Sequence, residues 1–181
     1  VSALRELEAA GKPVLPGADL LAIIQDKAEQ KALWDDAGLL SAPWALVEGD
    51  LPDARAIVAA ARGIGGFPLV QKARRGGYDG RGVKAIASEA EAGFLGTAPE
   101  GMGLLLCPSL VEAKVDFAKE LAVVVARSSD GSTAVYPCVE MVFDPRVNMC
   151  DSVLVPAEES PSILERAREV QRWSFSSRKR W

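Results

Sequence analysis

The sequence predicts an α+β fold of two lobes, each built around antiparallel strands. Three observations support this prediction. Apolar residues repeat at helical spacing in several segments of the first half, two apolar runs flank a glycine-rich loop between residues 67 and 86, and Asp130-Gly131 separates two long strand-like stretches. We expect one lobe over roughly 40–108, a second from about 109, and a hinge near Pro108–Asp116.

The composition narrows the class of protein. With 181 residues, 49% of them hydrophobic, the chain can bury a core. Its net charge of −4 argues against a general nucleic-acid binder, and no apolar run approaches the roughly 18 residues of a membrane span. The lack of histidine removes imidazole catalysis and histidine-bound metals. Three cysteines without CxxC spacing favour reduced thiols in the cytoplasm, and the first residues lead us to expect a start inside a longer protein.

The segments before the glycine-rich loop read mainly as helices. Asp19 and Asp26 precede apolar stretches as N-caps, while Gly11 and Gly38 follow such stretches as helix stops. The helices are expected at 2–10, 20–24, 27–37 and about 51–64, with a strand at 43–47.

The segments after the loop read mainly as strands. Ser88 can cap one short helix ending near Leu95, and a further helix starts near Ser162. The tail from Arg172 has no useful periodicity. Strands are expected at 103–107, 117–127, 133–143 and 151–155, with 109–116 as a connecting segment.

The glycine-rich loop connects two antiparallel strands and carries positive charge. Glycines can reach positive φ and leave no Cβ between the backbone and a ligand, so successive N–H groups can converge on an anion. The combination suits a polyphosphate; the alternative is an ordinary hairpin with a flexible tip. Neither GxxxxGK(S/T) nor a GxGxxG turn into a helix is present. The residues concerned are Gly76, Gly77, Gly80 and Gly82, with Lys72, Arg74, Arg75 and Arg81.

A second segment, 110–121, offers the other contacts that a nucleotide needs. The backbone of Val111, Ala113 and Val115 could meet the edge of an adenine, and Glu120 could accept both ribose hydroxyls. The alternative is a strand whose charged residues are simply solvated.

Taken together, these motifs resemble the ATP-grasp superfamily and, within it, the 5-(carboxyamino)imidazole ribonucleotide synthetases of purine biosynthesis. The resemblance covers about residues 13–157. The matching strings are Asp26–Lys31, Phe67–Lys72, Gly76–Gly82, Val111-Glu112, Phe117–Leu121, Val125–Arg127 and Tyr136–Glu140. It implies an ATP-grasp fold whose two α+β lobes grip a nucleotide.

The resemblance also implies roles for individual residues. Lys27 and Lys72 would contact phosphates, Glu112 and the backbone of Ala113, Lys114 and Val115 would hold adenine, and Glu120 would hold the ribose. The lid over the phosphates would be Gly77, Tyr78, Asp79, Gly80, Arg81, Gly82 and Val83, of which Tyr78, Asp79 and Arg81 would also face the substrates as catalytic residues. Phe143 occupies the place of a nucleotide-site histidine, because Met141, Val142 and Phe143 follow Glu140 where the family has Asn-x-His.

The family's reaction sets the remaining expectations. ATP would phosphorylate bicarbonate to carboxyphosphate, whose carboxyl group passes to aminoimidazole ribonucleotide. Metal ligands for Mg²⁺ are expected beyond this chain, a homodimer is possible, and the fragment alone would have little or no turnover. We expect residues 1–16 to be the end of an N-terminal domain, 17–108 the small lobe with its lid, and 109–181 part of the large lobe. Two alternatives stay open: another ATP-grasp ligase, such as a formate-dependent transformylase or a biotin carboxylase-like enzyme, and a non-catalytic nucleotide-binding domain.

Overall fold

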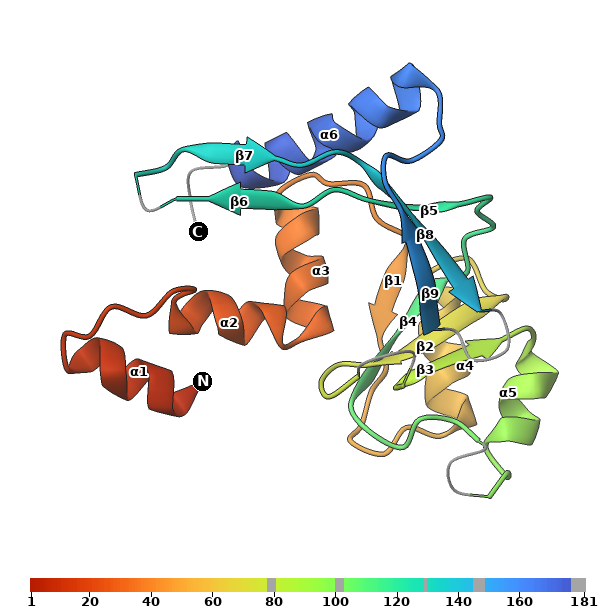
Figure 1. Ribbon diagram of the computed structural model, residues 1–181. Helices are drawn as coiled ribbons and strands as arrows, with labels where there is room; N and C mark the ends of the chain where they lie inside the picture. The colour runs from red at the N-terminus through yellow and green to blue at the C-terminus, as the bar shows by residue number, and fades with distance from the viewer. Residues whose placement is uncertain (78–80, 100–102, 129, 145–148, 177–181) are drawn as a thin grey trace. The chain divides into compact units, whose positions relative to one another are not determined.

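A computed structural model describes the chain except for a few short stretches (Figure 1). The residues outside the description are 78–80, 100–102, 129, 145–148 and 177–181. The described chain divides into two compact units, residues 1–115 and 116–181. The fold is α+β with antiparallel sheets, as the sequence predicted.

Three helices open the first unit: α1 (Ser2–Ala9), α2 (Ala18–Ile24) and α3 (Lys27–Asp36). Asp26 is the N-cap of α3, as predicted, and its side chain accepts a hydrogen bond from the Ala28 N–H. The predicted cap at Asp19 is wrong, because α2 begins at Ala18 after Gly17. The carboxylate of Glu8 accepts from the Ala18 N–H at 2.8 Å, so an acceptor from α1 satisfies this helix end.

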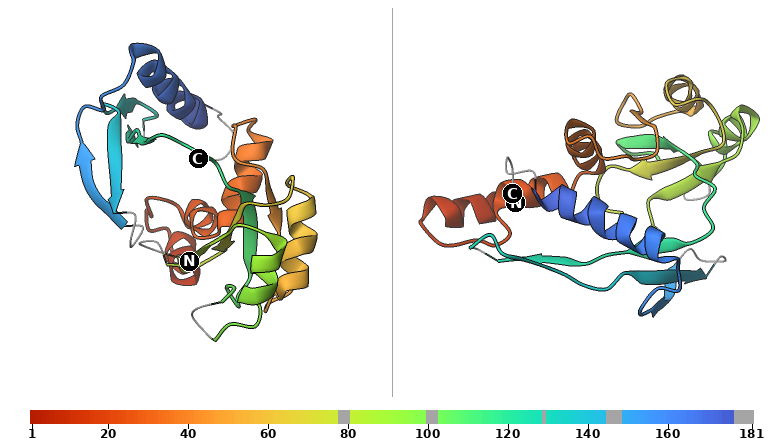
Figure 2. Two further views of the ribbon diagram at one scale, coloured as in Figure 1. Left: turned by 90° about the vertical axis from the view of Figure 1, so that its right-hand side faces the viewer. Right: turned by 90° about the horizontal axis from the view of Figure 1, so that it is seen from above.

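A four-stranded antiparallel sheet forms the centre of the first unit, in the order β1-β4-β2-β3. Its elements are β1 (Trp44–Leu46), α4 (Ala54–Arg62), β2 (Leu69–Ala73), β3 (Val83–Ile86), α5 (Glu89–Leu95) and β4 (Ser109–Ala113). Helices α4 and α5 lie side by side on one face of the sheet (Figures 1 and 2). The core beneath them is apolar, with Ile57, Leu69, Ile86 and Val111 essentially inaccessible to water.

The strand predicted at 103–107 is wrong, and the strand lies at Ser109–Ala113 instead. Leu105 uses its backbone N–H and C=O for hydrogen bonds with the side chain of Gln71, at 2.9 and 3.0 Å, so it pairs with a side chain and not with a strand. The segment that we expected to be a connection pairs on one side with β1 and on the other with β2. It therefore contributes the second strand of the first sheet.

The second unit contains a three-stranded sheet in the order β5-β8-β9, a separate hairpin of β6 and β7, and the helix α6. The bounds are β5 (Glu120–Ala122), β6 (Val125–Arg127), β7 (Thr133–Val135), β8 (Val139–Asp144), β9 (Met149–Leu154) and α6 (Pro161–Ser176). The hairpin at Asp130-Gly131 is confirmed, and Gly131 has a φ of 86°. Helix α6 continues past Val170 into the tail for which the sequence showed no periodicity.

The two long strands predicted at 117–127 and 133–143 are each divided in the structure. Pro137 has no N–H to give to a ladder, which interrupts the second stretch between β7 and β8. The Tyr136 N–H donates to the Val124 carbonyl at 2.9 Å, opposite the interruption of the first stretch. Both stretches therefore pass between the three-stranded sheet and the hairpin at the same point, where Tyr136 lies opposite Val124.

Candidate functional site

The first part of the site lies on the face of the four-stranded sheet opposite α4 and α5. Side chains alternate along a strand, so the buried Leu69, Gln71 and Ala73 of β2 face the helices while Lys72 faces away. In the neighbouring strand β4, Val111 faces the helices and Glu112 faces away. Because Val70 is the register partner of Glu112, Lys72 lies diagonally across from that carboxylate on the same face.

Three charged side chains meet on this face and are called here the Lys31–Glu112–Lys72 cluster. Lys72 Nζ lies 2.9 Å from Glu112 Oε2, and Lys31 Nζ, from α3, lies 3.2 Å from Glu112 Oε1. Lys31 Nζ also lies 5.4 Å from the centre of the Trp34 ring, a cation–π distance. Our sequence reading missed Lys31 as a site residue. Its position four residues after Lys27, on the same face of a helix, is the signal that could have indicated it.

The glycine-rich loop closes tightly on itself beside Lys27. A Cβ on Gly77 would lie 2.9 Å from the Arg81 carbonyl oxygen and 3.3 Å from Lys27 Nζ. Gly76 and Gly82 have φ values of 75° and 71°, which favour glycine. A backbone cradle with an amino group next to it is a fitting receptor for a phosphate group.

The start of α3 is fixed to the base of this loop. The Lys27 N–H donates to the Arg74 carbonyl at 2.9 Å, and Arg74 returns two hydrogen bonds to the Asp26 carboxylate, at 2.7 and 3.0 Å. Arg75 adds a third at 3.2 Å. Burial of Asp26 opposes its ionisation, but the hydrogen bonds from Arg74 and Ala28 and the charges of both arginines outweigh burial and hold the pKa of this carboxyl below its ordinary value. Both arginines thus anchor the loop.

The remaining lid residues are placed only in part. Tyr78, Asp79 and Gly80 lie outside the described residues. Arg81 is exposed, and Val83 begins β3 opposite Lys72. The roles predicted for these residues stay predictions.

The strip expected to meet adenine is partly occupied by other hydrogen bonds. Val111 lies between β1 and β2 in the sheet, so our expectation that its backbone could meet a base is wrong. The Ala113 N–H donates to the Pro43 carbonyl at 2.8 Å and the Lys114 N–H to the Pro68 carbonyl at 3.1 Å. Among the groups predicted to hold adenine, the Glu112 side chain and the last residues of the strip, through Val115, remain candidates.

Glu120 and Phe143 belong to the three-stranded sheet of the second unit. Glu120 is the register partner of Met141, and Phe143 lies two residues further along β8. The β-bulge between β8 and β9 adds its extra residue to β9. The side chains of β8 therefore alternate without interruption between the two faces of the sheet, and Glu120, Met141 and Phe143 share one face. The two residues predicted to contact the nucleotide from this unit are therefore neighbours.

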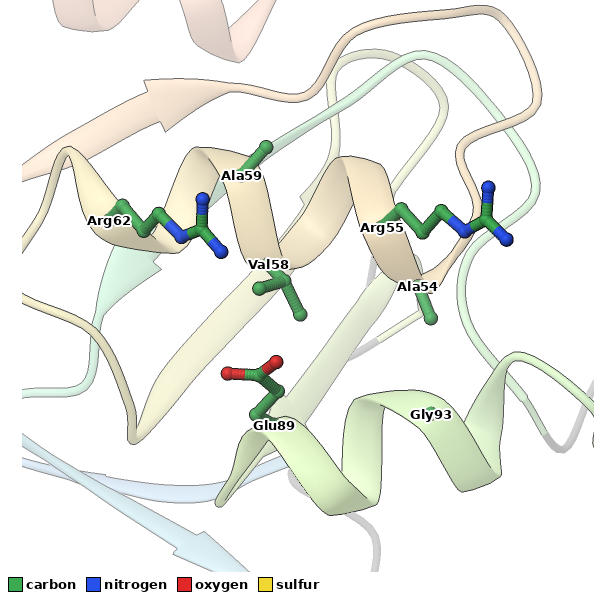
Figure 3. Close-up of a pocket in the computed structure, with 7 residues that line it drawn as sticks. All are labelled: Ala54, Arg55, Val58, Ala59, Arg62, Glu89 and Gly93. Atoms are coloured by element: carbon green, nitrogen blue, oxygen red, sulfur yellow. The ribbon is translucent and has the colours of Figure 1, made fainter.

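Other features do not add to the site. Among the described residues, no group of three or more His, Cys, Asp and Glu side chains could hold a metal ion. None of the helices in the described part is both long and apolar enough to cross a membrane. A groove between α4 and α5 is lined by Arg55, Val58, Arg62 and Glu89 among others (Figure 3). It lies on the face of the sheet opposite to the one that carries Lys72.

The geometry therefore offers an anion receptor, which consists of the glycine loop with Lys27 beside it and two lysines that share the Glu112 carboxylate. The described site contains no histidine and no arranged nucleophile, which suits phosphoryl transfer, where positioning and charge neutralisation do most of the work.

Comparison with known proteins identifies the kind of domain. The family model of the ATP-grasp domain matches residues 33–175. An N5-carboxyaminoimidazole ribonucleotide synthase of a Synechocystis species is 33% identical over 169 residues, which cover 93% of this chain and 39% of that protein. The chain thus spans about two fifths of the length of such relatives.

Solved structures agree. A carboxyaminoimidazole ribonucleotide synthase from Aspergillus clavatus complexed with ATP matches with a TM-score of 0.83 at 27% identity, over 97% of this chain and 43% of that one. The N5-carboxyaminoimidazole ribonucleotide synthetase from Thermotoga maritima matches with a TM-score of 0.71 at 32% identity, over 96% of this chain and 41% of that one. The chain therefore belongs to the ATP-grasp family.

Proposed function

We propose that this chain binds ATP and ADP. The phosphates lie against Lys27, Lys72 and the loop Gly77–Val83, and the adenine lies beside Glu112 and the end of the strip Ala113–Val115. The fit of the residues to a polyphosphate supports the proposal: Gly77 has no room for a side chain next to the Arg81 carbonyl, and the Lys27 amino group lies beside it. The observation that carries it is the pairing of this cradle with the Lys72–Glu112 ion pair on a single sheet.

A residue of the second unit is also part of the proposal. Glu120 accepts the two ribose hydroxyls, which a carboxylate can do with one oxygen for each. Phe143 replaces a polar contact by an apolar one on the same face of β8. The same proposal assigns 17–108 to the small lobe, 109–181 to the large lobe and 1–16 to a preceding domain, and the match to the ATP-grasp domain supports it.

For the protein that contains this domain we propose the reaction named for its relatives: the ATP-dependent carboxylation of 5-aminoimidazole ribonucleotide. A bicarbonate oxygen attacks the γ-phosphorus, ADP leaves, and carboxyphosphate forms. The exocyclic amine then bonds to the carboxyl carbon, and phosphate leaves with loss of a proton from nitrogen. Lys72 and Lys27 neutralise phosphate charge, and the loop Gly77–Val83 excludes water from the labile carboxyphosphate. Tyr78, Asp79 and Arg81 would face the two substrates.

Further properties belong to the same proposal. Mg²⁺ bound with the nucleotide would supply further positive charge to neutralise its phosphates. Such a protein would act in the cytoplasm on small molecules and could form a homodimer. One competing function is that of another ATP-grasp carboxylate–amine ligase. The other is that of a non-catalytic nucleotide-binding domain, and Phe143 in place of a polar residue favours this second alternative.

Calorimetric titration with MgADP tests nucleotide binding. We expect wild-type binding to weaken about tenfold or more in Lys72→Ala and in Glu120→Ala, which corresponds to about 1.4 kcal/mol or more. The exposed Lys12→Ala is the control and should bind as wild type does. Identical heats for all four proteins would refute the proposed site.

The reaction is tested on a protein with the full length of the relatives. ATP hydrolysis should depend on both aminoimidazole ribonucleotide and bicarbonate. Hydrolysis that depends on a different carboxylate would favour another ligase, and nucleotide binding without any hydrolysis would favour the non-catalytic domain.

A further inference from the structure

The Lys31–Glu112–Lys72 cluster contains one more lysine than the proposed nucleotide contacts require. Each lysine takes its own oxygen of Glu112: Lys31 lies 3.2 Å from Oε1, and Lys72 lies 2.9 Å from Oε2. One carboxylate is thus shared between two ammonium groups, and the cluster keeps a net charge of one positive unit.

The two lysines differ in their access to water. The Lys31 side chain is 8% exposed, beside a Glu112 side chain that is 11% exposed, whereas the Lys72 side chain is 30% exposed. Lys31 is also held by the face of Trp34. The inner lysine therefore has a fixed position, and the outer lysine has space to swing toward solvent.

A buried carboxylate that loses its partner is strongly destabilised. If Lys72 were the single partner of Glu112, a phosphate that drew it away would leave a carboxylate uncompensated. With Lys31 on the other oxygen, Glu112 stays paired when Lys72 moves. In the proposed nucleotide site that phosphate lies against Gly77, beside which Lys27 is placed.

We propose that Lys31 is a positioning residue that serves as the permanent counter-ion of Glu112 and so allows Lys72 to leave that carboxylate for the phosphates of a nucleotide. The proposal rests on the proposed nucleotide-binding function. It assigns to Lys31 no contact with the nucleotide: Lys31 acts through Glu112 and Lys72.

The test separates phosphate binding from adenine binding by using inorganic tripolyphosphate and ADP in calorimetry. Lys31→Met should weaken tripolyphosphate binding about tenfold or more, because Lys72 is then the last partner of Glu112. Adding Glu112→Gln to Lys31→Met should restore tripolyphosphate affinity to within about threefold of wild type, since a neutral amide no longer retains Lys72. Lys31→Arg, which keeps the charge, should bind within about threefold of wild type.

Salt dependence distinguishes this local effect from the loss of one positive charge near the site. Screening reduces interactions between distant exposed charges but reduces those of buried pairs much less. The ratio of wild-type to Lys31→Met affinity should therefore stay constant between about 50 and 300 mM salt. Lys12→Met, which removes an exposed lysine in the same unit, should leave the affinity unchanged.

The outcomes that overturn the proposal differ from those that overturn nucleotide binding. If wild type binds neither ligand, or if Lys72→Ala binds as well as wild type, the proposed function fails and the inference fails with it. If Lys72→Ala weakens binding but Lys31→Met does not, the role of Lys31 alone is refuted. The role of Lys31 is also refuted if a Lys31→Met protein with wild-type circular dichroism does not regain binding when Glu112→Gln is added. The loss would then come from a structural defect and not from retention of Lys72 by Glu112.

Discussion

Lys72 and Glu112 are 40 residues apart in the chain, yet Lys72 Nζ lies 2.9 Å from Glu112 Oε2. The pairing of β2 with β4 produces this contact, because it places Lys72 diagonally across from Glu112 on one face of the sheet. Lys72 is on the strand that enters the glycine-rich loop, and Glu112 is three residues before the end of the first unit. The ion pair therefore joins the proposed phosphate contacts to the proposed adenine contacts.

Replacement of Gly77 by alanine should impair the loop without unfolding the domain. The new Cβ would lie 2.9 Å from the Arg81 carbonyl oxygen, a backbone atom that moves only with the loop. We expect the affinity for MgADP to fall about tenfold, or about 1.4 kcal/mol. Calorimetry measures this change.

Gly93→Ala is the matched control for Gly77→Ala. Gly93 lies within α5, and a Cβ there would meet nothing within 4 Å. This change should leave MgADP affinity unaltered and raise the free energy of unfolding by up to about 1 kcal/mol through helix propensity. Equal affinities for the Gly77→Ala and Gly93→Ala proteins would show that closure of the loop is irrelevant to binding.

Gln71 should be essential for the first unit. It is fully buried, accepts from the Leu105 N–H and donates to the Leu105 carbonyl and to Ser109 Oγ. Gln71→Leu would leave these buried groups without their partner, so the free energy of unfolding should fall by about 2–4 kcal/mol. Urea denaturation measures it, with the exposed Gln25→Leu as the control. A change below about 0.5 kcal/mol in Gln71→Leu would contradict this role.

The two lysines of the cluster should differ in their effect on stability. When Lys31 is lost, the only remaining partner of the buried Glu112 carboxylate in the cluster is the partly exposed Lys72. Lys31→Met should therefore lower the free energy of unfolding by about 2–4 kcal/mol. Lys72→Met should lower it by at most about 1 kcal/mol, because Lys31 still pairs with Glu112 and water reaches Lys72. Thermal unfolding compares the two, and the reverse order would contradict the assignment of Lys31 as the permanent counter-ion.

Asp26 should make the stability of the first unit sensitive to acid. Its pKa in the folded chain lies below the ordinary value because the hydrogen bonds and charges of Arg74 and its neighbours outweigh burial. The stabilisation is therefore complete above the unfolded-state pKa of about 3.9 and is lost as the pH falls through the folded-state value. Asp26→Asn should cost about 1–3 kcal/mol near neutral pH, and the difference from wild type should shrink below about pH 4.

Urea denaturation at a series of pH values measures this difference. Asp53→Asn is the control, because Asp53 is also an N-cap and accepts from the Ala56 N–H but is exposed. A difference between wild type and Asp26→Asn that stays constant from neutral pH to about pH 3 would contradict the assignment.

Local signals in the sequence predicted the elements whose ends are set by nearby residues. The caps at Asp26 and Ser88 and the turn at Asp130-Gly131 were predicted because each depends on backbone groups a few residues away. The strand at Ser109–Ala113 was not, since a charged Glu112 stands in it and the lysines that pair with it come from distant parts of the chain. The apolar run at 103–107 looked more like a strand. The backbone N–H and C=O of Leu105 in that run instead form hydrogen bonds with the side chain of Gln71.

The proposed site rests on the resemblance of its motifs, and the structure adds tertiary contacts that the sequence did not indicate. Lys27 lies beside Gly77, and Lys72 pairs with Glu112 across the first sheet. Arg74 and Arg75 seemed equally suited to phosphate, but both hydrogen-bond to Asp26, a contact 48 and 49 residues away that no local pattern encodes. Lys31 was missed because a lysine in an amphipathic helix usually faces water.

The most direct measurement of the central claim is a crystal structure of this chain with MgADP. The account predicts the β-phosphate within hydrogen-bonding distance of Lys72 Nζ and the backbone of the loop Gly77–Val83, with Lys31 still on Glu112 and the ribose hydroxyls on Glu120. ADP bound away from the glycine loop, or bound there with Glu120 far from the ribose, would contradict it.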